Sequence, residues 1–220
     1  MQDEEKIDSI VSNVQPGCTE KIKVTVTPMD RNNNTVVVMV EAETGLWGKW
    51  YDPVMIPPGY RIVGFQTRFE KYKKNQDDTA LNGIRILYSN KNGDGAVHSK
   101  SVHDGYWGDW GNKVHGPVGF EVVAIKTRFE KYKPNQDDTA LNGIKIRLLN
   151  RKTNSEIDLT VEEGLWGDWK AEFVGLTSTN PDLCIKNYYL AGIAVRVEAP
   201  VGSGDDTAMN GIRLYYRKLD

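Results

Sequence analysis

The stretch NQDDTALNGI occupies residues 75–84 and recurs letter for letter at residues 135–144, and the related stretch GDDTAMNGI occupies residues 204–212. The longer segments 67–84 and 127–144 are identical at 17 of 18 positions. Repetition at a long, fixed period is typical of a fold built from equivalent structural units. The three copies therefore predict three units within the 220 residues of the chain.

Each copy lies downstream of a tryptophan cluster: GLWGKW at 45–50, GYWGDW at 105–110 and GLWGDW at 164–169. These clusters hold all six tryptophans of the chain. They are 60 and 59 residues apart, which is longer than a propeller blade, and three units are fewer than a propeller needs. The pattern predicts three large β units.

The segments between these landmarks show the period-2 alternation of half-buried strands, for example in residues 22–27, 83–90 and 143–150. When the three copies are aligned on their aspartates, apolar residues match and predict a core. Those residues are Val63, Phe65, Phe69, Val123, Ile125, Phe129, Ala191, Ile193 and Val197. The intervening strand face repeats an arginine and a glutamate two residues apart, at 68 and 70, 128 and 130, and 196 and 198. No segment has a helical period, so the sequence predicts an all-β protein.

The two ends of the chain predict how the fold closes. The last strand, near residues 213–220, has counterparts in the other copies that begin the next unit. The strand at 22–26 begins the first unit with no Asp-Asp loop before it. We therefore expect the N- and C-terminal strands to complete one shared sheet of a closed, pseudo-threefold domain, which leaves few free edges. This domain would span residues 20–220, with units of about 20–79, 80–139 and 140–208, and residues 1–19 would lie outside it.

The composition is that of a globular protein, with 39% apolar residues, 26% charged residues and a net charge of −2. Lysine and arginine are spread among aspartate and glutamate, which argues against nucleic acid or a polybasic membrane patch as a partner. No apolar run approaches the length of a membrane span, and the first residues have no signal-peptide core. Cys18 and Cys184 allow at most one internal disulfide, so the fold does not depend on a disulfide framework.

The paired aspartates allow two interpretations. In the first they shape turns, because Asx side chains bond backbone N–H groups two residues on, the threonine hydroxyls add a bond, and an Asn-Gly step accepts positive φ. In the second, the threefold arrangement gathers the carboxylates at one end of the domain, where they bind sugar hydroxyls or a cation. The aspartates are Asp77, Asp78, Asp137, Asp138, Asp205 and Asp206. The turn residues are Thr79, Thr139, Thr207, Asn82, Gly83, Asn142, Gly143, Asn210 and Gly211.

The two tryptophans of each cluster are expected to differ. The glycines allow close backbone approach, so one indole per cluster, namely Trp50, Trp110 and Trp169, is predicted to fill the interior. The first indole, which is Trp47, Trp107 or Trp166, is predicted to be more exposed and to face a sugar ring.

Support for catalysis is thin. The three histidines, His98, His103 and His115, have no metal-ligand spacing and no copy in the other units, and they are expected at the surface. There is no Gly-x-Ser-x-Gly elbow and no phosphate loop. We therefore expect no cofactor, no metal site and no catalytic residue, although the acidic pairs leave a glycosidase open because such an enzyme needs two carboxylates.

Three Gly-x-Trp-Gly-x-Trp clusters, each followed by a strand and then by DDTALNGI or its variant, resemble the vitelline membrane outer layer protein I family over about residues 20–220. The resemblance implies a β-prism type I fold, in which three Greek-key sheets form the sides of a triangular prism. It also implies an extracellular coat or matrix role and an activity on N-acetylglucosamine oligosaccharides. The chain lacks the multiple cysteines of the animal egg-coat members, and Tyr215 stands where one of them is expected.

Three function classes follow from these observations. The first is a non-catalytic glycan-binding or coat protein whose partner is a glycan or a glycoprotein surface. The second is an enzyme acting on N-acetylglucosamine oligosaccharides, which rests on the resemblance. The third is a receptor-binding toxin, by analogy with other β-prism proteins. The near-identical first and second units predict at least two similar binding sites.

Overall fold

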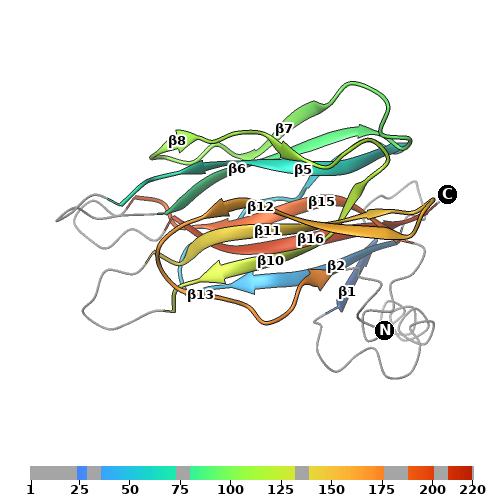
Figure 1. Cartoon of the computed structure of the whole chain (residues 1–220). Coiled ribbons are helices and arrows are strands. Elements are labelled where there is room, and N and C mark those ends of the chain that lie inside the picture. Colours follow the sequence, from blue (N-terminus) through green and yellow to red (C-terminus); the bar gives the residue numbers. More distant parts are fainter. Residues whose placement is uncertain are drawn as a thin grey trace, which may run out of the picture.

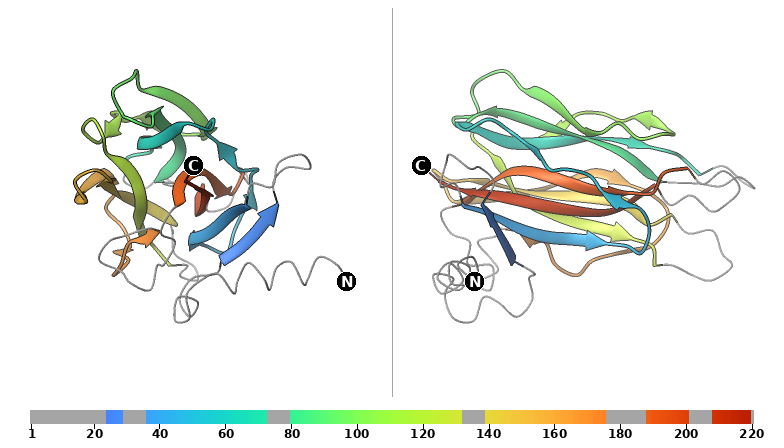
Figure 2. Two further views of the ribbon diagram at one scale, coloured as in Figure 1. Left: turned by 90° about the vertical axis from the view of Figure 1, so that its right-hand side faces the viewer. Right: turned by 180° about the vertical axis from the view of Figure 1, so that it is seen from behind.

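The computed structural model describes residues 24–28, 36–72, 80–131, 139–175, 188–200 and 208–219, and every regular element in these ranges is a strand. The strands form three antiparallel sheets (Figure 1). Seen end-on, the three sheets surround a common centre like the sides of a prism (Figure 2, left). The predicted all-β β-prism fold is confirmed.

The three sheets share one arrangement of five strands, to which sheet A adds β1 at its edge. Sheet A contains β1 (Val24–Pro28), β2 (Val36–Thr44), β16 (Met209–Lys218), β15 (Tyr188–Val197) and β3 (Lys49–Trp50), and β4 (Val54–Met55) also pairs with β15. Sheet B contains β7 (His98–His103), β6 (Leu81–Asn90), β5 (Tyr60–Phe69) and β8 (Asp109–Trp110), and β9 (Val114–His115) also pairs with β5. Sheet C contains β12 (Ser155–Glu163), β11 (Leu141–Asn150), β10 (Glu121–Phe129) and β13 (Asp168–Trp169), and β14 (Val174–Gly175) also pairs with β10.

Sheets B and C are Greek keys of consecutive strands, whereas sheet A joins strands from both ends of the sequence. β2 pairs with β16 in register from Gly211 opposite Thr44 to Arg217 opposite Val37. The prediction that the first and last strands share a sheet is therefore confirmed.

The core lies where the central strands β5, β10 and β15 meet. The predicted core residues Phe65, Ile125 and Ile193 are fully buried at equivalent places in the three strands. Val63, Val123, Ala191 and Val197 are also buried, whereas Phe69 and Phe129 are half-buried and pack against the edge of the core.

A charged cluster joins the three sheets at the start of these strands. Arg61, Glu121 and Tyr189 hold equivalent positions in β5, β10 and β15, and all three are buried. The Arg61 Nε lies 3.2 Å from Glu121 Oε2, and its guanidinium lies 3.8 Å from the centre of the Tyr189 ring. Arg151 binds the other carboxylate oxygen of Glu121 at 2.6 Å. Equivalent positions thus hold a cation, an anion and an aromatic ring that complement one another.

The expectation that the Asn-Gly steps form turns with positive φ is wrong. Asn82, Asn142 and Asn210 are buried near the start of β6, β11 and β16. In the described parts of these three hairpins, positive φ occurs instead at the alanine two places earlier, namely Ala80 (50°), Ala140 (50°) and Ala208 (46°).

The glycine of each Asn-Gly step allows the backbone of the neighbouring chain segment to lie close to it. A Cβ at Gly83, Gly143 or Gly211 would lie 2.8–2.9 Å from a carbonyl oxygen of the neighbouring strand. Such a distance leaves no room for a side chain, so these positions require glycine although their backbone is extended.

Several predicted features lie outside the described residues. These are residues 1–19, Cys18 and Cys184, the six aspartates at 77, 78, 137, 138, 205 and 206, and Thr79 and Thr207. Both interpretations of the aspartates therefore stay predictions.

Candidate functional site

Each tryptophan cluster forms a loop between a long strand and a two-residue strand, and the three loops (45–48, 105–108 and 164–167) are referred to as the tryptophan loops. The Gly45 N–H donates to Asn210 O (2.6 Å), and the Gly164 N–H donates to Asn142 O (2.7 Å). The asparagines of the Asn-Gly steps thus anchor the loops of their own sheets.

The second glycine of each tryptophan loop has φ near +80°, with values of +81° at Gly48, +78° at Gly108 and +74° at Gly167. A Cβ at Gly167 would lie 2.4 Å from the Phe129 carbonyl carbon and 2.5 Å from Glu130 N. The loop therefore lies directly on the backbone of the adjacent central strand, which only glycine permits.

Three arginines hold the tryptophan loops. The Arg128 side chain donates to Gly167 O (3.0 Å), Gly164 O (2.7 Å) and Leu165 O (3.0 Å). Arg68 and Arg196 contact the other two loops in the same way. The sequence places these arginines at equivalent positions, but the alternation of the strands assigns them only to a polar face. The signal that could have identified them is their recurrence next to glycine-rich loops whose carbonyl groups need donors.

The second indole of each cluster does not fill the interior, contrary to the prediction. Trp50, Trp110 and Trp169 are half-buried and lie outside the apolar core. The guanidinium of Arg213 lies 3.8 Å from the Trp50 ring centre, and that of Arg85 lies 3.7 Å from the Trp110 ring centre. These cations lie on the outward face of their strands, because the residues on either side of them face the core. The indoles therefore cover the outer faces of the sheets.

The first indoles are the more exposed ones in two of the three clusters. Trp47 and Trp166 are each 44% exposed, and Trp107 is half-buried. Each of the two exposed indoles lines a groove between its own sheet and the next.

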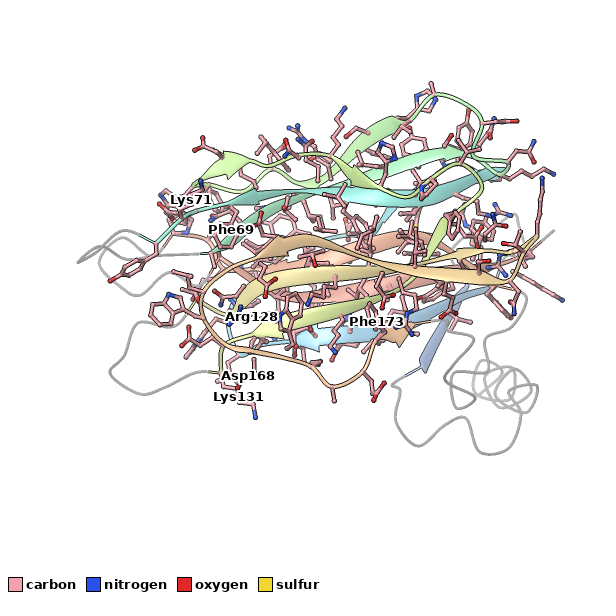
Figure 3. The ribbon with its side chains drawn as sticks, viewed as in Figure 1. Phe69, Lys71, Arg128, Lys131, Asp168 and Phe173 are labelled. Atoms are coloured by element: carbon pink, nitrogen blue, oxygen red, sulfur yellow. The ribbon has the colours of Figure 1, made fainter. Side chains whose placement is uncertain are left out.

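The larger groove, which we call the Trp47 groove, has a volume of about 310 Å³ and joins sheets A and C. Sheet A contributes Trp47 and Asn210 with their neighbours, and sheet C contributes Phe129, Glu130 and Lys131. Figure 3 shows Lys131 just past the end of β10, at the end of the prism that carries the tryptophan loops. The groove thus combines the indole of the first unit with the hairpin base of the second.

The Trp166 groove repeats this arrangement between sheets C and B. Leu165, Trp166 and Asn142 face Phe69 and Glu70. Its volume is only about 20 Å³. The Tyr72 ring packs edge-on against Trp166 with 5.9 Å between ring centres, which accounts for the smaller opening.

A hydrogen-bonded network lies under the two grooves. The Thr139 hydroxyl donates to Glu130 Oε2 (3.0 Å) and accepts from Asn142 Nδ2 (2.5 Å). Asn142 Oδ1 is buried and has no hydrogen-bond partner, although Asn142 lines the Trp166 groove. A buried acceptor of this kind favours a donor supplied by a ligand or by water.

The third corner, between sheets B and A, differs. Sheet A has Val197 and Ala199 where the other sheets have Phe69 or Phe129 and Lys71 or Lys131. The near-identical first and second units therefore provide the phenylalanine and glutamate of both grooves, and the second unit adds Lys131 to the Trp47 groove.

His103 was expected at the surface but is half-buried beside the second tryptophan loop, 105–108. Its Nδ1 accepts a hydrogen bond from the Gly105 N–H (3.0 Å). Desolvation lowers the pKa of His103 below its usual value of 6.5, although the Asn82 carbonyl and the nearby Asp104 carboxylate oppose this shift. Among the described residues, no three histidine, cysteine, aspartate or glutamate side chains are grouped to hold a metal ion.

The lowered pKa predicts a pH effect on stability. Between the folded-state pKa of His103 and 6.5, the unfolded chain binds more protons than the folded chain, so stability falls as the pH drops below about 6.5. We expect His103→Gln to flatten this part of a plot of Tm against pH from 7.5 to 5, and the same change at the exposed His98 to leave it unchanged. Equal slopes for the wild type and His103→Gln would contradict the assignment.

Comparison with known proteins places this arrangement in a family. Residues 36–115 and 97–214 match the family model described as Vitelline membrane outer layer protein I. The chain belongs to this vitelline membrane outer layer protein I family. It is 33% identical over 186 residues to the human vitelline membrane outer layer protein 1 homolog, covering 84% of each chain. The mouse homolog is 31% identical over 172 residues, covering 78% of each chain.

Solved structures with a similar arrangement of strands have a lower sequence identity to this family member than the two homologs have. Malaysian banana lectin is 12% identical, with a TM-score of 0.48 over 83% of this chain and 99% of the lectin. Within the described ranges, the family member has no helix long and apolar enough to cross a membrane.

Proposed function

We propose that the protein is a non-catalytic glycan-binding component of an extracellular coat or matrix. The observation that carries this proposal is the pair of grooves at one end of the prism, each lined by an exposed indole and a buried polar floor. The apolar face of a pyranose ring stacks on an indole, while its hydroxyl groups bond to polar side chains. The family relatives are named for an outer layer of a vitelline membrane, which supports the extracellular setting.

The polar groups of the grooves suit sugar hydroxyls. Lys131 is an exposed donor beside Trp47, and Glu130 forms part of the same wall. In the Trp166 groove, the side chains of Thr139, Asn142 and Glu70 form the polar part of the lining. Each groove therefore offers both a stacking surface and hydrogen-bonding groups.

The lining of the Trp47 groove favours binding over hydrolysis. Among the described residues that line it, Glu130 is the carboxylate, and it already accepts from the Thr139 hydroxyl. Glycoside hydrolysis needs two carboxylates across the scissile bond. Two weak sites of unequal size at one end of the prism would instead gain affinity by engaging the same glycan-covered surface.

Trp47→Ala tests the proposal. We expect binding of chitotetraose at the Trp47 groove to weaken about tenfold, because stacking on an indole contributes on the order of 1 kcal/mol beyond area burial. Tm should change little, since the indole is 44% exposed. Isothermal titration calorimetry and thermal unfolding measure the two effects.

Trp50→Ala is the matched control, because it removes an indole from the same cluster that stacks on Arg213 outside the groove. It should lower Tm and leave chitotetraose binding unchanged. Equal loss of binding in both variants would contradict the groove assignment, and release of shorter oligomers by the wild type would favour an enzyme.

A further inference from the structure

Four aromatic rings meet at the third corner of the prism. Tyr51 follows β3 of sheet A, whereas His103, Tyr106 and Trp107 belong to β7 and the tryptophan loop of sheet B. The ring centres of Tyr51 and His103 are 4.7 Å apart, those of His103 and Tyr106 are 5.6 Å apart, and those of Tyr106 and Trp107 are 5.6 Å apart. The rings thus form a continuous chain across the corner.

Two of these rings remain open to solvent. Tyr51 is 40% exposed and Tyr106 is 41% exposed. The Tyr106 side chain is the largest cause of the raised pKa of Tyr51, ahead of desolvation. Both exposed phenol rings also pack edge-on against the His103 ring, which places them at the same corner.

The other two corners show that the fold does not require these aromatic residues. Alignment on the tryptophan clusters and on strand register gives the counterparts of Tyr51, His103 and Tyr106. At the corner of sheets A and C they are Lys170, Glu43 and Leu46, and at the corner of sheets C and B they are Gly111, Glu162 and Leu165.

Those counterparts join the sheets by polar contacts instead of rings. The Thr127 hydroxyl donates to Glu43 Oε2 (3.1 Å), and Lys170 Nζ lies 3.1 Å from the same oxygen. The Thr67 hydroxyl donates to Glu162 Oε2 (3.3 Å). Contacts between two sheets at a corner therefore do not require aromatic rings. The other two corners have a leucine at the position of the exposed Tyr106, so closure of the fold does not require a tyrosine there.

An acidic residue borders the rings. Asp104 lies between His103 and the second tryptophan loop, and it accepts from the Ser101 hydroxyl (2.9 Å) and from Arg85 (3.2 Å). The bond from Ser101, more than any other contact, lowers the pKa of Asp104, so the carboxylate is ionised and accepts hydrogen bonds at neutral pH. The corner therefore combines flat apolar faces with polar groups at its rim.

We propose that Tyr51, Tyr106 and Trp107 form a further glycan site, here called the tyrosine platform, which binds the apolar face of a pyranose ring. The proposal rests on the glycan-binding function inferred above, but it assigns a separate site with different chemistry. Aromatic faces with hydroxyl tips suit a sugar, which presents C–H groups and hydroxyls together. Three rings match one or two sugar units and are too small for a protein partner, which needs about 800 Å².

The other corners supply the test variant. Tyr51→Lys with Tyr106→Leu installs the residues found at the corner of sheets A and C, so the variant is expected to fold and to keep its Tm within about 2 °C of the wild type. Chitotetraose is the probe, followed by calorimetry and by NMR of the aromatic side chains. We expect the variant to bind about one tetramer fewer than the wild type, with the remaining affinity within about twofold.

The outcomes separate the platform from the grooves. Unchanged stoichiometry in the double variant, or loss of all binding in Trp47→Ala, would overturn the platform and leave the grooves standing. If the wild type does not bind chitotetraose, both the proposed glycan-binding function and the tyrosine platform are contradicted. If the double variant unfolds, Tyr106→Leu alone must reduce binding in the same way, and failure to do so overturns the proposal.

Discussion

Gly167→Ala is expected to lower the free energy of unfolding by about 3 kcal/mol or more, because the new methyl group would meet backbone atoms that cannot move aside. The Cβ would lie 2.4 Å from the carbonyl carbon of Phe129, inside β10, and the residue would also keep a φ of +74°. Urea unfolding followed by tryptophan fluorescence measures the change.

Gly59→Ala is the matched control for this substitution. Gly59 has a similar φ of +81°, but a Cβ there would have no atom within 4 Å. Its expected cost is about 1–2 kcal/mol, which is the backbone penalty alone. If both variants lost the same free energy, the close contact between the tryptophan loop and β10 would not be the reason for the glycine.

Glu121→Gln is expected to be the second severe change, with a loss of about 3–5 kcal/mol, because it leaves Arg61 buried without its anion. Glu121 and Arg61 are both buried, and Arg151 would lose the same partner. Chemical denaturation at pH 7 gives the magnitude.

Two further variants test the cause of that loss. Asp158→Asn removes one carboxylate partner of Arg147, which keeps Glu156 at 3.7 Å, and the Asp158 side chain is 44% exposed, so the expected cost is below about 1 kcal/mol. Replacing both charges, with Arg61→Met and Glu121→Leu, should recover much of the stability, since an apolar pair of similar volume often matches a buried ion pair. A double variant as unstable as Glu121→Gln would argue that the charges themselves are needed.

Much of the fold was predictable because the same pattern of apolar and polar residues can be observed in three copies of one structural unit. The alternation that aligned Phe65 with Ile125 and Ile193 identified the core, since a strand must bury one face whatever its partner. The sharing of one sheet by the first and last strands follows from the repeats, because the last strand has counterparts that begin the next unit. Both inferences use local periodicity, which the sequence expresses directly.

The turn chemistry was not predictable in the same way. The register shifts after Arg68, Arg128 and Arg196, so the left-handed residue of each hairpin is an alanine rather than the asparagine two places later. The Glu70 N–H donates to Ala80 O (2.8 Å) across this irregularity. A bulge of this kind depends on contacts between strands, and alanine carries no local preference for positive φ.

The candidate site was predicted only in part. The exposure of Trp47 and Trp166 agrees with the sequence argument, but the face of Trp50 depends on Arg213, which is far away in the chain. The grooves also combine residues from different units, as with Trp47 and Glu130. The repeats in the sequence show which residues recur in each unit. Which residues of two units lie side by side depends on how the three sheets close into the prism.

The pairing of β2 with β16 also bears on synthesis of the chain. Arg213 on β16 binds Glu41 on β2 across a separation of 172 residues, while sheets B and C are built from strands that are close in sequence. During translation β2 therefore cannot pair with β16 until almost the whole polypeptide has been synthesised. Such long-range pairing slows folding and exposes an unpaired edge meanwhile. Ribosome-bound chains that end before β16 should accordingly bind holdase chaperones through sheet A, even when sheets B and C have formed.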